Sequence, residues 1–425
     1  MRAVKVLLII VAACAVGVVV VAVAAITANN VESNQTQEAL DPFYTPPNPV
    51  VGKPGDIIRF EPLTGFNITD GTGYRILYVS KDPTGALRAS GGMVFVPTKP
   101  VAGERKVVAY AHGTSGLGDA CAPSRSPLTP TAQPFIQTLM NLGYVYTATD
   151  YVGLGTPGEP FYMIGSSEAQ DVVNSVRAAR NFPGSNAGTT YAVMGHSQGG
   201  HSAIWTGALS KEIAPELDLV GVAASAPATQ LEPLLNQQWN SLIGWAIGPE
   251  VALSWPLVYP ELAPVDILTP TGVELYTDLA YECLEAAGMK GAIESAMGKE
   301  LFAENPAKVP AWAAAMKDQT PAPLPPSMPT LISQAIGDGV VLANTNSLTQ
   351  QKWCAAGSNV QFNWLGQLAT GPLASAETHE NTLYAAWPME TDWIQARFAN
   401  EPATSNCGFT PPVAPYPVPA TPTSP

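Results

Sequence analysis

The stretch Tyr191-Ala-Val-Met-Gly-His-Ser-Gln-Gly-Gly200 decides the fold. Its first four residues predict a short buried strand, and the residues from Gly200 to about Leu209 predict a helix. The G-x-S-x-G motif between them is typical of the sharp strand-to-helix turn that exposes a nucleophilic serine, here Ser197. The alternative is a glycine-rich turn with an idle serine, and the strand-to-helix context argues against it.

Apolar runs on both sides of this turn predict further strands, and apolar positions within residues 168–180 recur at the spacing of a helix face. Strands that alternate with helices indicate βαβ units and a mainly parallel sheet flanked by helices. Residues 391–398 predict a closing helix. The predicted strands lie at residues 106–112, 143–149, 191–194, 219–225, 329–336 and 360–364.

The alternation stops after about Pro227, where the chain becomes rich in Leu, Trp, Ala and Pro. We interpret residues 228–326 as an inserted, largely helical cap, with a helical stretch at Leu279–Met297. Its tryptophans Trp239, Trp245 and Trp255 either pack within the cap or line a pocket for an apolar substrate. The predicted core comprises residues 51–227 and 327–410, and residues 411–425 form a Pro-rich tail.

The amino terminus has the layout of an export signal. Arg2 and Lys5 precede an uncharged apolar run, Val6–Ile26, as in a secretory signal peptide. The run is also long enough to span a bilayer, so residues 1–28 are a signal peptide or a membrane anchor. Residues 29–50 read as a linker. We therefore expect a secreted or cell-envelope-associated protein.

Composition bounds the function classes. The chain has 425 residues, of which 46% are hydrophobic and 13% charged, enough apolar material for a large core. The formal net charge of −14 excludes an electrostatic nucleic-acid binder, because little in the chain could neutralise phosphates. Without Cys14 in the export segment, four cysteines remain, and an even count in an exported chain indicates two disulfides with three pairings open. No Cys-x-x-Cys occurs and the chain has only four histidines, so we expect no metal site and no cofactor.

A serine hydroxyl needs a base to become a nucleophile. Among the four histidines, only His379 follows the last predicted strand, in the loop Ala376–Glu380. That is the position of the base in the chain order Ser, Asp, His. A surface-loop histidine is the alternative interpretation. The other three histidines are disfavoured as the base. His112 ends an early strand, His196 lies inside the turn with its side chain pointing away from Ser197, and His201 is held by the following helix.

The third member of the predicted triad is Asp338, which follows the predicted strand 329–336 and would hold the imidazole in its tautomer. A turn-capping aspartate is the alternative reading. Asp266 is a rival in the predicted cap, and Glu377 lies too close to His379 in the chain.

Two backbone amides are candidates for an oxyanion hole. The amide of Gln198 lies at the start of the helix that follows Ser197. The second would come from the turn His112–Gly116, at the N–H of Thr114 or Ser115. A plain glycine turn is the alternative there.

Together these segments resemble the α/β-hydrolase superfamily and, more closely, a bacterial-type member of the secretory lipase family, which includes the fungal lipase A type. The resemblance covers about residues 50–407 and implies an α/β-hydrolase fold with a helical cap and the disulfides Cys121–Cys283 and Cys354–Cys407. Fungal members place an acidic side chain near the oxyanion hole. No clear equivalent occurs around Gly116, although Asp119 is close. The matching pieces are His112–Gly116, Cys121–Ser124, Asp150–Gly155, Gly195–Gly200, Gly337–Asp338, Cys354, His379 and Cys407.

We therefore expect an exported serine hydrolase, a lipase or esterase, that cleaves triacylglycerol or other acyl esters through an acyl-enzyme on Ser197. Its partners would be a small-molecule or lipid ester and a lipid interface, with no nucleic acid. Two alternatives stay open. One is a peptidase or haloperoxidase on the same fold. The other is a non-catalytic, envelope-anchored binding protein.

Overall fold

The computed structural model describes residues 37–126, 129, 131–371 and 373–418. The predicted signal or anchor segment, residues 1–28, lies outside them, as do residues 419–425 of the predicted tail. The chain divides into two compact units, Met1–Thr45 and Pro46–Pro425. In the first unit, residues 37–44 form a helix within the predicted linker. In the part of the chain that the structure describes, no helix has the length and apolar character needed to cross a membrane.

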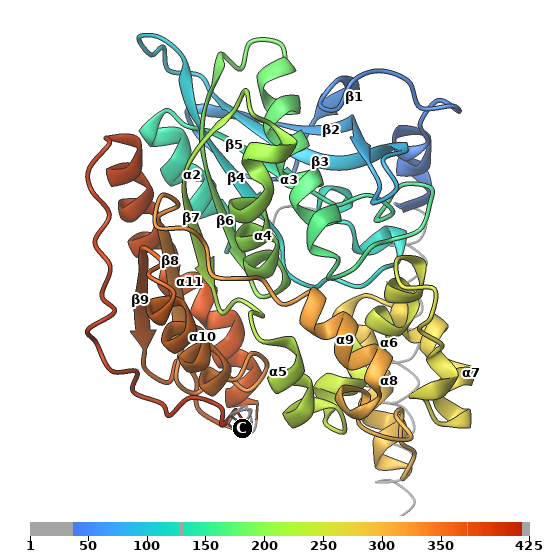
Figure 1. Cartoon of the computed structure of the whole chain (residues 1–425). Coiled ribbons are helices and arrows are strands. Elements are labelled where there is room, and N and C mark those ends of the chain that lie inside the picture. Colours follow the sequence, from blue (N-terminus) through green and yellow to red (C-terminus); the bar gives the residue numbers. More distant parts are fainter. Residues whose placement is uncertain (1–36, 127–128, 130, 372, 419–425) are drawn as a thin grey trace, which may run out of the picture. The chain divides into compact units, whose positions relative to one another are not determined.

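One sheet organises the second unit. Its strands are β1 (Ile57–Pro62), β2 (Gly71–Lys81), β3 (Leu87–Pro97), β4 (Arg105–Ala111), β5 (Val145–Thr149), β6 (Ala187–His196), β7 (Asp218–Ser225), β8 (Thr330–Ala335) and β9 (Val360–Leu365). Their order in the sheet is β1-β2-β3-β5-β4-β6-β7-β8-β9 (Figure 1). The pairs from β5 to β9 in this order are parallel, whereas β1, β2, β3 and β5 pair antiparallel. The predicted mainly parallel sheet is confirmed.

Helices cover both faces of this sheet. On one face, side chains of α3 (Gly165–Asn181), α4 (Gln198–Ile213) and α10 (Ala343–Ala355) share a hydrophobic cluster with Val107 and Ala109 of β4. On the other face, α2 (Gln133–Leu142) and α11 (Ala374–Phe398) pack against Val108. The alternation along β4 follows from the period of a strand, in which successive side chains point to opposite faces.

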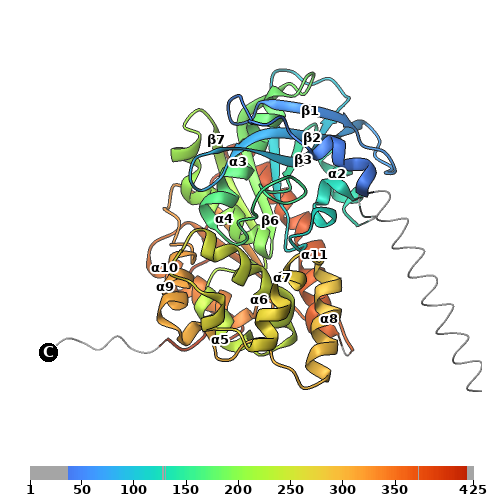
Figure 2. The same ribbon diagram turned by 90° about the vertical axis from the view of Figure 1, so that its right-hand side faces the viewer.

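Between β7 and β8 the chain forms α5 (Leu231–Gln238), α6 (Leu242–Ser254), α7 (Pro270–Ala280), α8 (Leu284–Ala296) and α9 (Pro310–Asp318). We call residues 231–318 the inserted helical segment. These helices gather at one end of the sheet in both views (Figures 1 and 2). They bury a hydrophobic cluster that contains Trp245, Trp255 and Trp312, with Trp239 partly buried against it. The cluster also includes residues from outside the segment, such as Tyr162 and Ile164.

The prediction of one helix over Leu279–Met297 is wrong. α7 ends at Ala280, and α8 begins at Leu284 after Cys283, whose backbone is extended. Cys283 is tied to Cys121 in a disulfide, which holds the chain away from a continuous helix. The structure also contains the disulfide Cys354–Cys407.

The carboxyl-terminal region differs from the sequence-based expectation in two ways. The loop predicted around His379 is part of α11, because Thr378, Thr382 and Ala386 recur at helical spacing and are buried against the sheet. In the predicted tail, residues 411–418 form no helix or strand but lie along α10, where the amide of Tyr416 donates to the carbonyl of Asn344 at 3.0 Å.

Candidate active site

The turn between β6 and α4, which we call the elbow, places Ser197 in a strained conformation, with φ 58° and ψ −120°. A Cβ atom at Gly195 would lie 2.0 Å from the carbonyl oxygen of Gly199, and one at Gly199 would lie 1.9 Å from that of Ala111. Both positions therefore require glycine, as the motif predicts. The Ser197 amide donates to the carbonyl oxygen of Ser225 at 3.0 Å, which fixes the turn to the end of β7.

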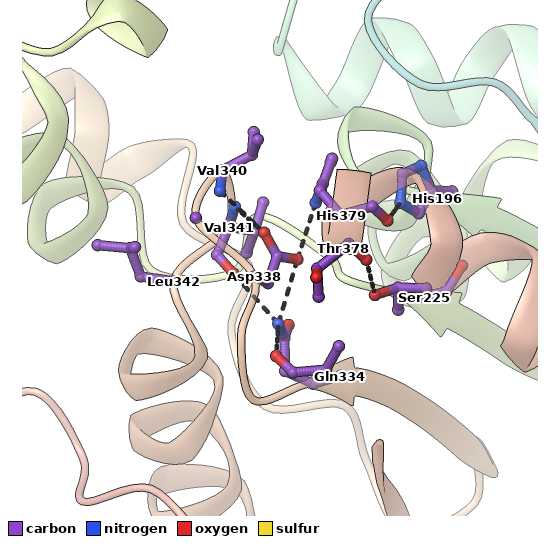
Figure 3. Close-up of polar contacts among 12 residues, drawn as sticks. His196, Ser225, Gln334, Asp338, Val340, Val341, Leu342, Thr378 and His379 are labelled. Atoms are coloured by element: carbon purple, nitrogen blue, oxygen red, sulfur yellow. Dashed lines mark hydrogen bonds and ion pairs between the residues drawn. The ribbon is translucent and has the colours of Figure 1, made fainter. Parts of the chain in front are cut away.

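The structure brings Asp338 and His379 together. His379 Nδ1 donates to Asp338 Oδ2 over 2.8 Å, and both side chains are buried (Figure 3). Because Nδ1 carries the proton, Nε2 is the ring nitrogen that can accept one. Asp266 belongs to a short helical turn, Pro264–Asp266, in the inserted helical segment, whereas the carboxylate that pairs with His379 is that of Asp338.

Three further hydrogen bonds orient the Asp338 carboxylate. Its Oδ1 accepts from the amides of Val340 and Val341, both at 2.9 Å, and its Oδ2 accepts from Gln334 Nε2 at 3.3 Å (Figure 3). Asp338 therefore caps its own turn and also holds His379. The two interpretations of Asp338 from the sequence, a turn-capping aspartate and the partner of His379, are therefore compatible.

The elbow and His379 are connected through the backbone. His196 Nε2 donates to the carbonyl oxygen of His379 at 3.0 Å, and the two rings lie 4.5 Å apart between centroids. No hydrogen bond joins Ser197 to His379 within the described ranges. Catalytic hydrogen bonds are often long before substrate binds, so this geometry is compatible with a proton transfer on binding.

The two histidines have opposite proton affinities. Burial alone lowers the pKa of His379, but the charge of Asp338 and the hydrogen bond to it outweigh burial, and the net pKa lies above the ordinary value of 6.5. Burial, and next the positive charge that His379 can carry, hold the pKa of His196 well below that value. His196 is therefore neutral, and His379 is the histidine suited to gain a proton.

The turn His112–Gly116 follows β4 and lies beside the elbow. The Thr114 hydroxyl hydrogen-bonds to the Tyr162 hydroxyl at 2.7 Å, and Thr114 lines the same cavity as Ser197 and Gln198. Ser115 lines a different, smaller cavity. Of the two predicted second oxyanion donors, Thr114 is thus the one that shares a cavity with Ser197.

Glu168 is a site residue that the sequence analysis missed. It lies in the first turn of α3, and its Oε1 accepts from Gln198 Nε2 at 2.8 Å. Its Oε2 accepts from His201 Nδ1 at 2.9 Å. A carboxylate on the buried face of a helix is the signal that could have identified it, because such a group needs polar partners.

The cavity beside Ser197 has a volume of about 120 Å³. We call it the large cavity, to distinguish it from the smaller one that Ser115 lines. Thr114, Ser197 and Gln198 line the large cavity at the elbow, and Gln238 of α5 also lines it. Most of the remaining wall consists of aliphatic and aromatic side chains, largely from the inserted helical segment. Trp255 belongs to this lining, whereas Trp239 and Trp245 do not. The apolar residues include Leu231, Leu234, Leu235, Ile243, Ile247, Val251, Ile267, Phe302, Trp312 and Met316. Among the described residues, no group of three or more His, Cys, Asp or Glu side chains is placed to hold a metal ion.

A mostly parallel sheet with Ser197 on the turn after β6, Asp338 after β8 and His379 in the last helix defines an α/β-hydrolase. Residues 124–406 match the profile of the family described as secretory lipase. The chain belongs to this family, and it is a carboxylic-ester hydrolase.

Individual relatives agree with membership of this family. A secreted triacylglycerol lipase of Malassezia globosa is 26% identical over 399 residues, which cover 86% of this chain and 82% of the relative. A Mycobacterium tuberculosis protein named "probable inactive lipase" is 24% identical over 395 residues, covering 86% of this chain and 83% of the relative.

Two solved structures share the fold. The rice cell wall degrading esterase LipA of Xanthomonas oryzae superposes with a TM-score of 0.69 at 18% identity, covering 81% of this chain and all of that chain. The closed state of Candida antarctica lipase A superposes with a TM-score of 0.64 at 20% identity, covering 88% of this chain and 89% of that chain. The predicted α/β-hydrolase fold is therefore confirmed.

Proposed function

We propose that the protein is an exported serine hydrolase that cleaves carboxylic esters through an acyl-enzyme on Ser197. The observation that carries the proposal is the buried Asp338–His379 pair, joined through His196 to the strained elbow that bears Ser197. Because one relative is named a probable inactive lipase, the proposed activity of this chain rests on its own residues rather than on family membership alone.

In the proposed reaction, Ser197 Oγ attacks the ester carbonyl carbon while His379 Nε2 takes its proton. The tetrahedral oxyanion is held by the amide of Gln198 and by that of Thr114. His379 then returns the proton to the leaving alcohol, which departs and leaves an acyl-enzyme. A water molecule, deprotonated by His379, attacks the acyl carbon, and Ser197 regains its proton as the acid leaves.

The substrate we propose is an ester with an apolar acyl chain, such as a triacylglycerol. The large cavity next to Ser197 supports this, because aliphatic and aromatic side chains form most of its wall away from the elbow. We propose that residues 228–326 act as the cap over this cavity. The relative from Malassezia globosa, named for its action on triacylglycerol, favours the same substrate class.

We also propose that the enzyme contacts a lipid interface through α8. Ala287 and Gly291 of α8 are buried, and a Cβ atom at Gly291 would lie 2.5 Å from that of Trp245. Three apolar residues four apart are exposed: Met289 and Ile293 of α8 and Met297 at its C-cap, at 65%, 59% and 59%. Replacing all three with serine should lower activity on emulsified triolein but leave a dissolved ester unaffected; equal loss on both would contradict the contact.

The decisive experiment compares the wild-type chain with Ser197→Ala on p-nitrophenyl esters of about two to about sixteen carbons. We expect Ser197→Ala to lose activity by at least about a thousandfold at every length. Ser295→Ala, which alters an exposed serine of α8, is the matched control and should behave as wild type. Unchanged hydrolysis by Ser197→Ala would refute the proposal.

Two further measurements separate the alternatives. A fluorophosphonate should label wild type but not Ser197→Ala, and failure to label wild type would support the non-catalytic binding protein. Matched amides should be hydrolysed far more slowly than esters, whereas comparable rates would support a peptidase. Export is tested separately, by locating the full-length chain in culture medium, envelope or cytosol.

A further inference from the structure

A second, much smaller cavity lies directly behind the turn His112–Gly116. Its volume is about 20 Å³. Tyr162 and Gln198 line both this small cavity and the large one, so they separate the two. From the inserted helical segment, Glu250 of α6 also lines the small cavity.

Three polar side chains that line the small cavity have no hydrogen-bond partner among the residues that the structure describes. They are Glu250, with both carboxyl oxygens, and the hydroxyls of Ser115 and Ser167. These atoms are fully shielded, and Glu250 is 1% exposed. Polar groups buried in this way are almost always hydrogen-bonded in folded proteins, so three at one cavity require an explanation.

The other carboxylate at this cavity shows the contrast. Glu168 accepts from the Met163 amide at 3.1 Å, from Gln198 Nε2 at 2.8 Å and from His201 Nδ1 at 2.9 Å. The protein therefore satisfies Glu168 with its own donors and supplies none to Glu250. The missing partner of Glu250 must be small enough to fit beside it.

The size and charge of the small cavity select that partner. A buried water needs about 10–15 Å³ and two to four polar partners, and the small cavity offers both. Burial raises the pKa of the Glu250 carboxyl well above its usual range. The raised pKa favours a neutral carboxyl with one hydrogen to donate. The oxygens of Glu168, the other carboxyl at this cavity, already accept from protein donors, so neither group is set to bind a cation. No lysine or arginine lines the cavity to hold an anion.

We propose that the small cavity binds one water molecule, held by Glu250, Ser115 and Ser167, and that Glu250 acts through this water as a positioning residue for the turn His112–Gly116. The second part rests on the proposed function, since this turn carries the proposed oxyanion donor, the amide of Thr114. The proposed water site would link Glu250, in the inserted helical segment, to Ser115, the residue that follows Thr114 in the turn.

The opposite side of the turn is already fixed by protein contacts. The Ser115 carbonyl oxygen accepts from the Leu284 amide at 3.0 Å, and a Cβ atom at Gly116 would lie 2.1 Å from the Glu282 carbonyl oxygen. The turn is therefore held against the start of α8 by its backbone. The bound water would hold the Ser115 hydroxyl of this turn from the side of α6.

A crystal structure of the wild-type chain at about 1.5 Å or better tests the first part, because ordered waters are visible there. We expect one water within hydrogen-bond distance of Glu250, Ser115 and Ser167. Absence of density in the small cavity, or a direct hydrogen bond from Glu250 to protein, would overturn the site.

Two substitutions of one residue test the second part. Glu250→Gln keeps a neutral group that can bond the water, whereas Glu250→Leu keeps the volume but no polar atom. With p-nitrophenyl butyrate we expect Glu250→Gln to retain kcat within about twofold and Glu250→Leu to lose about tenfold in kcat, with KM within about threefold, a loss smaller than that of an oxyanion donor. Glu285→Gln and Glu285→Leu, at an exposed glutamate of α8, are matched controls and should both match wild type.

The outcomes separate the two proposals. Equal activity of Glu250→Leu and wild type, or equal loss in both Glu250 variants, would overturn the positioning role. If Glu250→Leu fails to fold, Ser115→Ala, which removes one ligand of the water, should lower kcat in the same direction, and no change would overturn the role. A wild-type enzyme that a fluorophosphonate does not label would overturn the proposed function but leave the crystallographic test of the water site intact.

Discussion

His196 Nε2 donates a hydrogen bond to the backbone carbonyl oxygen of His379 over 3.0 Å. The residue before the proposed nucleophile therefore holds the backbone of the proposed base. His196 is buried and its pKa is held low, first by burial and then by His379, so it is a neutral donor rather than a second base. The sequence predicts that the His196 side chain points away from Ser197, and in the structure it points to the carbonyl oxygen of His379.

This contact predicts a specific effect of replacing His196. His196→Phe keeps an aromatic ring but removes the donor, so we expect kcat to fall by roughly tenfold through misplacement of His379. KM should change little, because His196 does not line the large cavity. Steady-state kinetics with p-nitrophenyl butyrate measure both constants. His196→Gln, which keeps an N–H donor, is the matched control and should recover part of the loss; equal kcat in both variants would argue against the contact.

The raised pKa of His379 predicts the acid limb of the activity profile. The base acts only when its imidazole is neutral, so kcat/KM should rise with pH and reach half its maximum above pH 6.5, the ordinary value. In Asp338→Asn the carboxylate no longer raises this pKa while burial still lowers it, so the limb should move to lower pH. The maximum should also fall by about 10⁴-fold. Profiles of kcat/KM from about pH 5 to about pH 9 decide this. A wild-type limb below 6.5 would contradict the assignment.

The parallel half of the sheet and the geometry of the candidate site could be predicted because each depends on local pattern. The strands from β4 to β9 are short apolar runs, and the elbow requires glycine at Gly195 and Gly199 whatever the rest of the chain does. Chain order alone then selected Asp338 and His379, which the structure brings to 2.8 Å. These predictions depended only on residues close together in the sequence or on the fixed geometry of the G-x-S-x-G motif.

The parts that were missed depend on neighbours far away in the chain. The antiparallel strands β1, β2 and β3 are not among the predicted strands. β3 contains Gly91 and Gly92, a residue type depleted in strands, but a Cβ atom at Gly92 would lie 2.4 Å from the carbonyl oxygen of Ala148 in β5. The helix around His379 carries Pro388 in its interior and is held by burial against the sheet. Glu168 and Glu250 became recognisable only once packing had buried them.

The two disulfides should differ in what their loss affects. In the chain-entropy model, separations of 53 and 162 residues correspond to about 4 and about 5 kcal/mol of unfolding free energy. Replacing Cys121 and Cys283 with serine should also lower kcat, because the chain beside Cys283 holds the turn His112–Gly116. Replacing Cys354 and Cys407 should reduce stability but leave kcat within about twofold, and so serves as the control. Urea unfolding and esterase kinetics measure both effects; a kcat loss limited to the second pair would contradict this view.

The wall of the large cavity predicts how acyl-chain preference can be changed. Ile247 of α6 lines this cavity near Val251, on the side formed by the inserted helical segment. Ile247→Trp fills part of the about 120 Å³ beyond Ser197, so a long acyl chain loses space that an acetyl group never uses. We expect kcat/KM for a p-nitrophenyl ester of about ten carbons to fall by about tenfold or more, and that for the acetate to stay within about twofold. Val273→Trp, on α7 and 37% exposed, adds the same side chain outside the cavity and should leave the whole chain-length profile unchanged. A uniform loss at all chain lengths in Ile247→Trp would mean that the acyl chain does not enter this cavity.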